Sequence, residues 1–331
     1  MPSASKLSAA MSADRRTPPQ VKPGSMNTGR TPRIGVIHNA RARHNIGRDL
    51  PLVIDGCDRV IPRTHDELHS VLGSFVDKGI DTLIVEGGDG TVRDILSIIA
   101  RHFPRFRPSM AIVPSGKTNA LALDLGISSR WTLDDAVAAV ATGRTAERTP
   151  IEIIRDGRVD LCGFIFGAGA YLRATKTAQG AHRIGAFNGL AVGMSIAAGV
   201  GQTVFGKPHN PWRSGEHMRL AWDAEEAVDG PQYLILASTL GRMPLRIKPF
   251  GQERLGMKML RIDAPASHVL RALPAILTGA QWAWLKRAGY HRHDTRQLQL
   301  SMEGGFVLDG ETFPGGDLIL RQGAPVAFVV P

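Results

Sequence analysis

The chain has 331 residues, of which 43% are hydrophobic, and it carries 40 Lys and Arg against 30 Asp and Glu, a formal net charge of +10. This length predicts two domains, and the hydrophobic content excludes a disordered chain. Two cysteines, Cys57 and Cys162, are too few for a disulfide framework, so we expect a reducing, cytoplasmic compartment. The basic residues are scattered and form no nucleic-acid-binding motif, so we expect no nucleic-acid partner.

Two stretches bear on targeting. Residues 1–32 are rich in Ser, Pro, Gly and Arg and contain no apolar core region, so we expect a disordered tail rather than a secretory signal. Residues 184–206 carry no charge and are long enough to span a bilayer. Their many glycines and several polar residues favour a buried helix instead.

Strands and helices alternate in the first half of the chain. Thr64 and Glu67 form a capping-box pattern that begins a helix ending near residue 78, and further helices follow residues 91 and 119 and span 132–143. We predict a parallel-sheet α/β domain over residues 33–150, since continuous apolar strands are typical of sheets buried on both faces. The predicted strands are 34–38, 57–61, 82–85 and 110–114.

After residue 149 the pattern changes to strands joined by turns. It predicts a second, β-rich and mostly antiparallel domain over residues 151–317, with helices near 185–200 and 267–287. The last segment, 318–331, is a candidate to complete the first domain. The predicted strands are 151–155, 158–166, 217–223, 232–239, 255–262, 297–302, 306–308 and 318–320.

The segment Gly87-Gly88-Asp89-Gly90-Thr91 connects a predicted buried strand to a predicted helix. Glycines let the backbone close around phosphate oxygens, and the helix N-terminus supplies N–H donors and a positive dipole. An aspartate in such a turn can orient a metal ion or accept a proton from an attacking hydroxyl. The alternative is a turn in which glycine serves only the backbone geometry. Asp89 and Thr91 favour phosphate chemistry.

Four motifs in chain order resemble the diacylglycerol kinase catalytic-domain superfamily, which includes bacterial lipid kinases, sphingosine kinases and ceramide kinases. The first motif is a strand that ends in Asn39, and the second is the 87–91 segment. The third is residues 114–126, and the fourth is the acidic segment 308–311, Leu-Asp-Gly-Glu. The resemblance covers residues 33–331 and implies the NAD kinase/diacylglycerol kinase-like architecture, with a parallel-sheet nucleotide-binding domain followed by an antiparallel, lipid-binding one.

The resemblance implies an ATP- and Mg²⁺-dependent enzyme that passes the γ-phosphoryl group to a hydroxyl of diacylglycerol, ceramide or a sphingoid base. Glu311 is the expected base, with Asp89 as the second candidate and Asp309 as a further catalytic carboxylate. Asp89 and Asp309 are also the expected metal ligands. The residues expected to contact the nucleotide are Asn39, Thr64, Gly87, Gly88, Asp89, Gly90, Thr91, the next two residues Val92 and Arg93, Gly116, Lys117 and Asn119.

Several positions depart from the family pattern. Lys117 stands where Thr or Ser is usual, and it either neutralises phosphate or is a solvated helix-start residue. The segment after Pro249 lacks the paired aspartates linked to a structural metal in many bacterial members, and 167–171 lacks the usual Phe-Asp. Two alternatives therefore stay open: a NAD kinase-like enzyme, which shares the 87–91 segment, and a catalytically inert lipid-binding regulatory protein.

A membrane-lipid substrate predicts that the second domain works at the inner membrane face without crossing the bilayer. Residues 267–287 place Leu270, Leu273, Leu277 and Trp284 at helical spacing, suited to the headgroup boundary. The alternative is that this stripe packs against the second domain. We expect a peripheral cytoplasmic protein, with a homodimer as a possible assembly. Attraction to anionic lipid is expected from Arg242, Arg246, Lys248, Arg254, Lys258 and Arg261.

Overall fold

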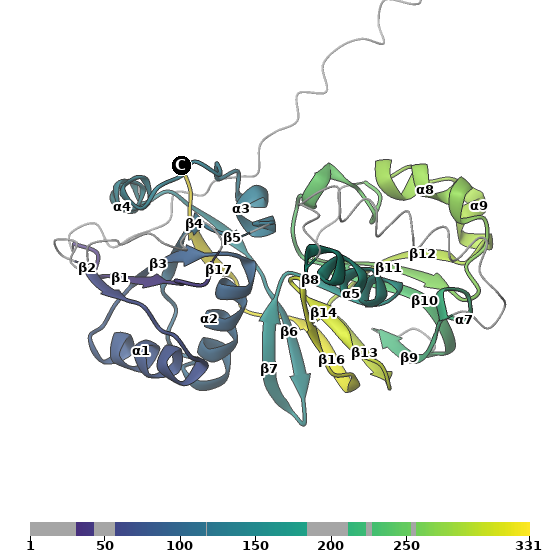
Figure 1. Cartoon of the computed structure of the whole chain (residues 1–331), viewed down its shortest axis with the longest axis horizontal. Coiled ribbons are helices and arrows are strands. Elements are labelled where there is room, and N and C mark those ends of the chain that lie inside the picture. The colour runs from purple at the N-terminus through teal and green to yellow at the C-terminus, as the bar shows by residue number, and fades with distance from the viewer. Residues whose placement is uncertain (1–30, 43–56, 117, 184–210, 223–226, 253–255) are drawn as a thin grey trace, which may run out of the picture.

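A computed structural model describes residues 31–42, 57–116, 118–183, 211–222, 227–252 and 256–331. Figure 1 shows two lobes side by side, each built on its own sheet. Within the described residues, the first sheet has six strands in the order β2-β1-β3-β4-β17-β5 and the second has eleven. The predicted fold class, a parallel α/β domain followed by an antiparallel β-rich domain, is confirmed.

The first sheet is parallel except at one edge. Its strand β5 (Thr145–Arg148) runs antiparallel to β17 (Val326–Val329), which the C-terminal end of the chain contributes. The other strands run parallel to their neighbours: β1 (Ile34–His38), β2 (Cys57–Val60), β3 (Thr82–Gly87) and β4 (Ser109–Pro114).

Helices cover both faces of the first sheet because alternate strand residues point to opposite faces. Leu83 and Val85 share one core with the helices α1 and α2, and Ile84 shares another with α4 (Figure 1). The short α3 follows β4. These helices are α1 (His65–Asp77), α2 (Asp89–His102), α3 (Ala120–Leu125) and α4 (Leu133–Thr142).

The second sheet is antiparallel throughout and encloses its own apolar core. Its strands are β6 (Ile151–Arg155), β7 (Arg158–Gly163), β8 (Ile165–Gly169), β9 (Glu216–Trp222), β10 (Val228–Ser238), β11 (Met257–Asp263), β12 (Tyr290–Thr295), β13 (Gln297–Met302), β14 (Phe306–Leu308), β15 (Glu311–Phe313) and β16 (Gly316–Gln322). The described helices of this lobe are α5 (Ala170–Arg183), α7 (Pro211–Ser214), the 3₁₀ turn η1 (Pro244–Arg246), α8 (Val269–Thr278) and α9 (Ala283–Arg287).

Some predicted boundaries were wrong. The predicted strand 158–166 is two strands, β7 and β8, and the predicted helix 267–287 is two helices separated by Gly279 at φ 82. Of the segment 318–331, only β17 joins the first sheet, whereas β16 belongs to the second. The sequence did not predict β5, β12, β15, β17 or α5.

The uncharged span 184–206 and the helix predicted at 185–200 lie outside the described residues. Among the helices that the structure describes, none is both long and apolar enough to cross a membrane.

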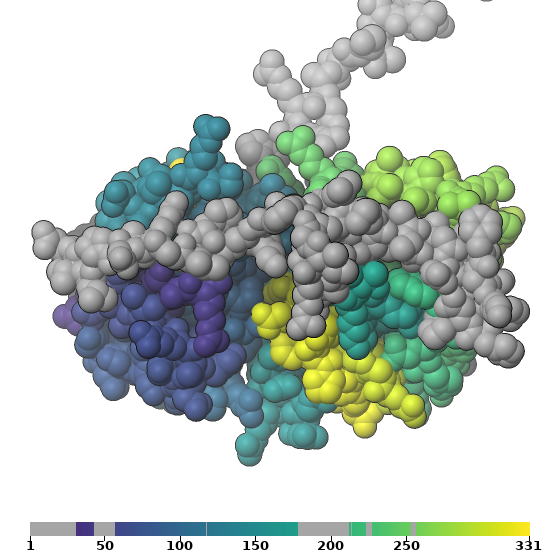
Figure 2. All heavy atoms as spheres, viewed as in Figure 1, coloured from purple at the N-terminus to yellow at the C-terminus, as the bar shows by residue number. Residues whose placement is uncertain are grey.

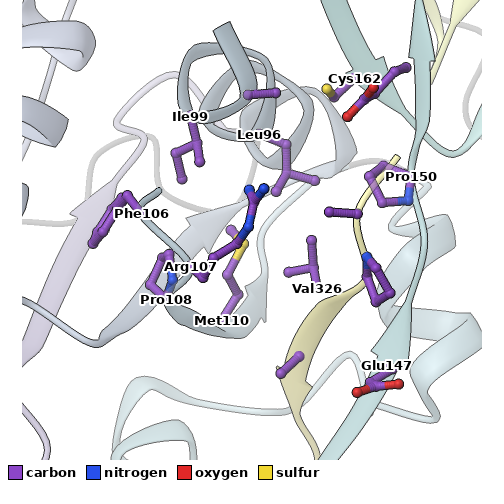
Figure 3. A pocket seen from close by; sticks show the side chains of 15 residues that line it. Leu96, Ile99, Phe106, Arg107, Pro108, Met110, Glu147, Pro150, Cys162 and Val326 are labelled. Atoms are coloured by element: carbon purple, nitrogen blue, oxygen red, sulfur yellow. The ribbon is translucent and has the colours of Figure 1, made fainter. Parts of the chain in front are cut away.

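The two lobes also meet away from the motifs. Helix α2 packs against β7, and Oγ of Ser97 accepts the N–H of Cys162 at 2.8 Å. A cavity of about 280 Å³ lies beside this contact and beside both crossings of the chain between the lobes (Figure 3). Its walls are mostly apolar, and none of its lining residues belongs to the four motifs. Burial, with a smaller contribution from the charge of Glu152, raises the pKa of the Cys162 thiol, so the thiol itself is uncharged.

Candidate active site

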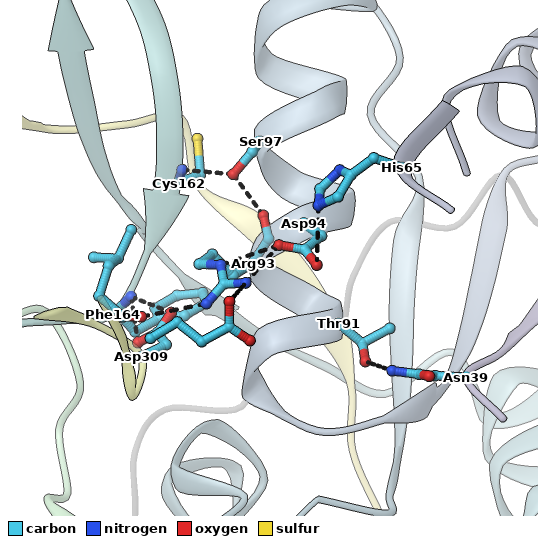
Figure 4. A network of polar contacts seen from close by, with 11 residues as sticks. Asn39, His65, Thr91, Arg93, Asp94, Ser97, Cys162, Phe164 and Asp309 are labelled. Carbon is cyan, nitrogen blue, oxygen red and sulfur yellow. Dashed lines mark hydrogen bonds and ion pairs between the residues drawn. The ribbon is translucent and has the colours of Figure 1, made fainter. Parts of the chain in front are cut away.

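The second motif forms the turn between β3 and α2. Gly87 ends β3, and Gly88 is the N-cap of α2. A Cβ on Gly87 would lie 2.5 Å from Oγ1 of Thr91, so only glycine fits there. Nδ2 of Asn39 donates a hydrogen bond of 2.7 Å to the same Oγ1, which joins the end of β1 to this turn (Figure 4).

The third motif lies directly against the second, because the neighbouring parallel strands β3 and β4 end at the same edge of the sheet. A Cβ on Gly116 would lie 2.7 Å from Cα of Gly88, so the two backbones touch. Asn119 closes the third-motif turn: its Oδ1 accepts the Gly116 N–H at 3.0 Å, and its Nδ2 donates to the Gly116 carbonyl at 3.1 Å. Together the two turns offer a glycine-lined backbone surface of the kind that binds phosphate.

The carboxylate of Asp89 anchors the helix that follows the third motif. Its oxygens accept the N–H groups of Ala120 at 2.9 Å and Leu121 at 3.1 Å, the first two residues of α3. Burial raises the pKa of Asp89, and these hydrogen bonds oppose the rise. Asp89 therefore links the second motif to the third, in addition to any chemical role.

Asp309, from the fourth motif, is the corresponding carboxylate of the second lobe. It lies in the β14–β15 turn at φ 47, and its oxygens accept the N–H groups of Phe164 and Ile165 at 2.8 to 3.1 Å (Figure 4). Burial, with a smaller contribution from the negative charge of Asp89, raises the pKa of Asp309 to about 7. The carboxylates of the two lobes are therefore close enough to influence one another.

Arg93 of α2 bridges the two lobes. Its side chain is only 2% exposed, and Nη2 donates to Oδ1 of Asp94 and to Oε2 of Glu311, both at 2.7 Å. Its guanidinium also lies 5.2 Å from the ring centre of Phe313, and Nη1 donates to the Leu308 carbonyl at 3.4 Å. Arg93 thus contacts the β14–β15 hairpin on both sides of its turn.

Glu311 is the most accessible of the three predicted catalytic carboxylates, with its side chain 61% exposed. One oxygen bonds to Arg93, and the other would lie 3.2 Å from a Cβ on Gly90, so it faces the second-motif turn. Asp89 and Asp309 differ from Glu311 because both oxygens of each accept backbone N–H groups.

The structure brings most of the predicted site residues to one place, but not all of them. Thr64 is the N-cap of α1, where its Oγ1 accepts the Glu67 N–H at 3.1 Å. The next residue, His65, has its Nε2 at 3.6 Å from Oδ2 of Asp94, so the start of α1 borders the site. Lys117 lies outside the described residues, and its predicted role stays a prediction.

Sequence analysis placed Arg93 among the expected nucleotide contacts but missed its contact with Glu311. The signal that points to it is a basic residue among the buried positions of α2, four residues after Asp89. A cation at such a position requires a carboxylate partner.

Asp89 and Asp309 fit a divalent cation. Carboxylate and phosphate oxygens are the ligands that Mg²⁺ prefers, and a nearby cation would favour the ionised form of Asp309. Within the described residues, no group of three or more His, Cys, Asp and Glu side chains is placed to hold a metal. A Mg²⁺ ion held by these two carboxylates would take its other ligands from phosphate oxygens and water.

Comparisons with known proteins agree with the motifs. Residues 56–153 match the family model of the diacylglycerol kinase catalytic domain. A curated relative, "Probable lipid kinase YegS-like" from Enterobacter sp. (strain 638), is 34% identical over 68 residues, which cover 20% of this chain and 22% of the relative. The chain thus matches about a fifth of that relative's length.

Solved structures match over a much larger part of the chain. A structure described as a diacylglycerol kinase from Bacillus anthracis str. Sterne has a TM-score of 0.59 at 13% identity. A second structure from this organism has a TM-score of 0.62 at 15% identity, and each match covers 90% of this chain and 97% of the other. At these identities the likeness concerns the fold. The family model thereby confirms the resemblance to the diacylglycerol kinase catalytic-domain superfamily over residues 56–153. The solved structures show that the likeness of fold extends over most of the chain.

Proposed function

We propose that this protein is an ATP-dependent lipid kinase, which transfers the γ-phosphoryl group of ATP to a hydroxyl group of a diacylglycerol, ceramide or sphingoid lipid. The ion pair between Arg93 and Glu311 carries the proposal, because it brings the acidic turn of the second lobe to the glycine turns of the first. A phosphate-binding surface beside an accessible carboxylate is what phosphoryl transfer to a hydroxyl requires.

The nucleotide phosphates would lie on the two glycine turns. The close approach of Gly88 to Gly116 leaves no side chain between the turns, so backbone N–H groups can reach phosphate oxygens. The N-terminus of α2 adds the positive end of a helix dipole. Asn39 fixes Thr91 and so holds the turn in shape.

The three carboxylates would take different roles. Glu311 is the base in this proposal, because its side chain is accessible and one of its oxygens faces the second-motif turn. Asp89 holds α3 with both oxygens, which makes it the weaker candidate for the base. Asp89 and Asp309 would hold a Mg²⁺ ion, whose charge neutralises the phosphate oxygens. Arg93 positions the carboxylate of Glu311.

The acceptor and its location belong to the same proposal. A membrane lipid as acceptor implies a peripheral protein at the inner face of the membrane, in the cytoplasm. Residues 119–122, Asn-Ala-Leu-Ala, favour a sphingolipid over diacylglycerol, because they are closer to the sphingosine-kinase version of the motif. A NAD kinase-like enzyme is the second candidate, because it shares the 87–91 segment. A catalytically inert lipid-binding protein is the third, because of the departure at Lys117.

A phosphoryl-transfer assay tests the proposal. The full chain is incubated with ATP labelled in the γ-phosphate and, separately, with diacylglycerol, monoacylglycerol, ceramide, sphingosine and NAD. We expect label in one lipid product, and the Glu311→Gln variant controls for contaminating kinases. Label in NAD alone would support the second candidate. No product with any acceptor, from folded protein that binds ATP or lipid, would support the inert protein.

A further inference from the structure

Five large apolar side chains are exposed along one edge of the molecule, which we call the apolar edge. They are 39% to 65% exposed and lie on or beside α3, η1, α8 and α9: Leu123, Leu245, Leu270, Leu277 and Trp282. Figure 1 shows α3, α8 and α9 along the same edge, and Figure 2 shows the light-green α8 and α9 segment at the surface. Of the large apolar side chains that the structure describes, only Ile61 and Val76 are otherwise exposed. Such a concentration marks an interaction surface.

The η1 segment and the two helices α8 and α9 form one unit. The N–H of Lys248 donates to the Leu277 carbonyl at 2.9 Å. The guanidinium of Arg292 donates to the carbonyls of Pro249, Ala275 and Ala280 at 2.8 to 3.0 Å, which holds the three segments together. The position of Leu245 relative to α8 is therefore fixed by backbone contacts.

Helix α8 turns one apolar face outward. Leu270 and Leu277 are seven positions apart, so they lie on the same face, whereas Ala272 and Ala275 are buried on the other. Only Leu273 and Trp284 of the predicted stripe are half-buried. Inward packing of the stripe, the alternative that the sequence left open, therefore does not account for Leu270 and Leu277.

The apolar edge continues onto the first lobe beside the active site. Oδ1 of Asp124 in α3 accepts the N–H of Arg242 at 2.5 Å, which joins α3 to the segment that leads into η1. Leu123 is the neighbour of Asp124 in the chain. Because the first N–H groups of α3 bond to Asp89, one short helix separates the apolar edge from the catalytic carboxylates.

In the second-lobe part of the apolar edge, the charged residues are all basic. No Asp or Glu occurs in 230–252 or in 264–293. Two residues that the sequence suggested as lipid contacts, Lys258 and Arg261, are buried and therefore cannot contact a lipid surface. Arg254 lies outside the described residues. The exposed basic side chains here are Arg242, Arg246, Lys248, Arg271, Lys286 and Arg287.

We infer that the apolar edge rests on an anionic lipid bilayer, with its leucines and Trp282 at the headgroup boundary and its basic residues against the lipid phosphates. Exposed apolar side chains with exposed Lys and Arg beside them are complementary to such a surface. The role of this surface rests on the proposed function, because a lipid acceptor stays in the bilayer and the enzyme has to reach it there. The apolar edge presents the active site to that acceptor.

Sedimentation of the full chain with vesicles tests the surface. The vesicles are phosphatidylglycerol mixed with phosphatidylcholine, or phosphatidylcholine alone. Two variants probe the edge: Leu270→Ser/Trp282→Ser removes apolar contacts, and Arg246→Glu/Lys286→Glu reverses charge. Two matched controls alter exposed residues elsewhere: Ile61→Ser/Val76→Ser, and Arg105→Glu/Arg158→Glu. Circular dichroism and thermal unfolding check that each variant is folded.

We expect wild type to bind the anionic vesicles, to lose binding at high salt, and to bind phosphatidylcholine weakly. Each edge variant should lower the partition coefficient by about tenfold or more, whereas both controls should stay within about twofold of wild type. Equal binding by edge and control variants would overturn the inference. A change of oligomeric state in Leu270→Ser/Trp282→Ser, measured by light scattering, would instead make the edge a contact between two copies.

Vesicle binding needs no ATP, so this test is separate from the test of the proposed function. Absence of phosphoryl transfer by wild type, with binding that depends on the edge, would reject the kinase and keep the surface. Phosphoryl transfer by wild type, with vesicle binding that is the same in the edge variants and in wild type, would support the kinase and reject the surface.

Discussion

Nη2 of Arg93 and Oε2 of Glu311 are 2.7 Å apart, although the two residues are separated by 218 positions in the chain. Arg93 is buried in α2, the helix that begins with Asp89, whereas Glu311 is exposed on the second lobe. A buried cation therefore fixes an accessible acid. Together with the contacts of Arg93 to the Leu308 carbonyl and the Phe313 ring, this ion pair holds the two lobes in a defined relation at the site.

Replacing Arg93 tests whether it acts through Glu311. Arg93→Lys keeps the charge but loses the planar fork that reaches Asp94 and Glu311 together. We expect kcat for lipid phosphorylation to fall by about tenfold or more, with KM for ATP within about threefold of wild type. In the Glu311→Gln background the same change should have little further effect, because residues that act as a unit are not additive.

Arg155→Lys is the matched control for Arg93→Lys. Arg155 donates to the carbonyls of Gly315 at 2.6 Å and Pro314 at 3.0 Å, in the segment just after β15. We expect this variant to keep kcat within about threefold of wild type. Equal losses in both variants would indicate a loosened second lobe, and a rise confined to KM for ATP would make Arg93 a nucleotide contact.

Asp89→Asn should affect both turnover and stability. Asp89 is an expected metal ligand and the second candidate for the base, so its loss should lower turnover. The hydrogen bonds from Ala120 and Leu121 add a cost in stability, because an amide accepts with one oxygen and carries no charge. We expect turnover to fall by about 100-fold or more and the free energy of unfolding to fall by about 1–2 kcal/mol, measured by denaturant titration.

Asp135→Asn separates these two effects of Asp89→Asn. Asp135 accepts the N–H of Thr132 at 2.8 Å in the capping box of α4, outside the four motifs. It should lower the free energy of unfolding through loss of the capping box and leave turnover unchanged. If Asp89→Asn keeps turnover within a few-fold of wild type, Asp89 has no part in the chemistry.

The order of the motifs predicted much of the site, because neighbouring parallel strands end at one edge of a sheet. The order of the strands in the sheet is enough to predict that three elements of the site lie together: Asn39, the 87–91 segment and Gly116. The partners of Asp89 and Asp309 could not be predicted, because backbone N–H groups carry no sequence signal. The Arg93–Glu311 contact depends on how the β14–β15 hairpin folds back onto α2, which local patterns do not contain.

The predicted boundaries of strands were wrong where backbone hydrogen bonds, rather than the apolar pattern, decide where a strand ends. The apolar pattern of residues 158–166 predicts one strand. In the structure, the Asp309 carboxylate accepts the N–H groups of Phe164 and Ile165, at the point where β7 ends and β8 begins. β17 was hard to assign because its neighbours, β4 and β5, lie far away in the chain.

Gly116→Ala should separate the two glycine turns. A Cβ at this position would lie 2.7 Å from Cα of Gly88, and backbone atoms cannot give way cheaply. We expect the Kd for ATP, measured by calorimetry, to rise by about tenfold or more, and the free energy of unfolding to fall by about 1–3 kcal/mol.

Gly73→Ala in α1 is the control for Gly116→Ala. Its Cβ would lie 3.6 Å from the nearest atom, so the free energy of unfolding should rise by about 0.5–1 kcal/mol. Unchanged ATP affinity in Gly116→Ala would mean that nucleotide does not lie on this turn.

The carboxyl group of Asp309 should make stability fall as pH rises in metal-free buffer. Its pKa is about 7 in the folded protein, against about 3.9 in an unfolded chain, so between these values the folded state holds a proton that the unfolded state has lost. Its contribution to stability is therefore fully present below about pH 4 and is lost by about pH 8.

The variant Asp309→Asn should remove this pH dependence, and asparagine suits the left-handed backbone at this position. The expected result is a smaller fall in Tm between about pH 5 and pH 8 with EDTA present. Mg²⁺ with a non-hydrolysable ATP analogue should raise the Tm of wild type more than that of the variant at the higher pH, because the variant lacks a carboxylate ligand. Identical pH profiles for the two proteins would show that Asp309 is already ionised without the metal.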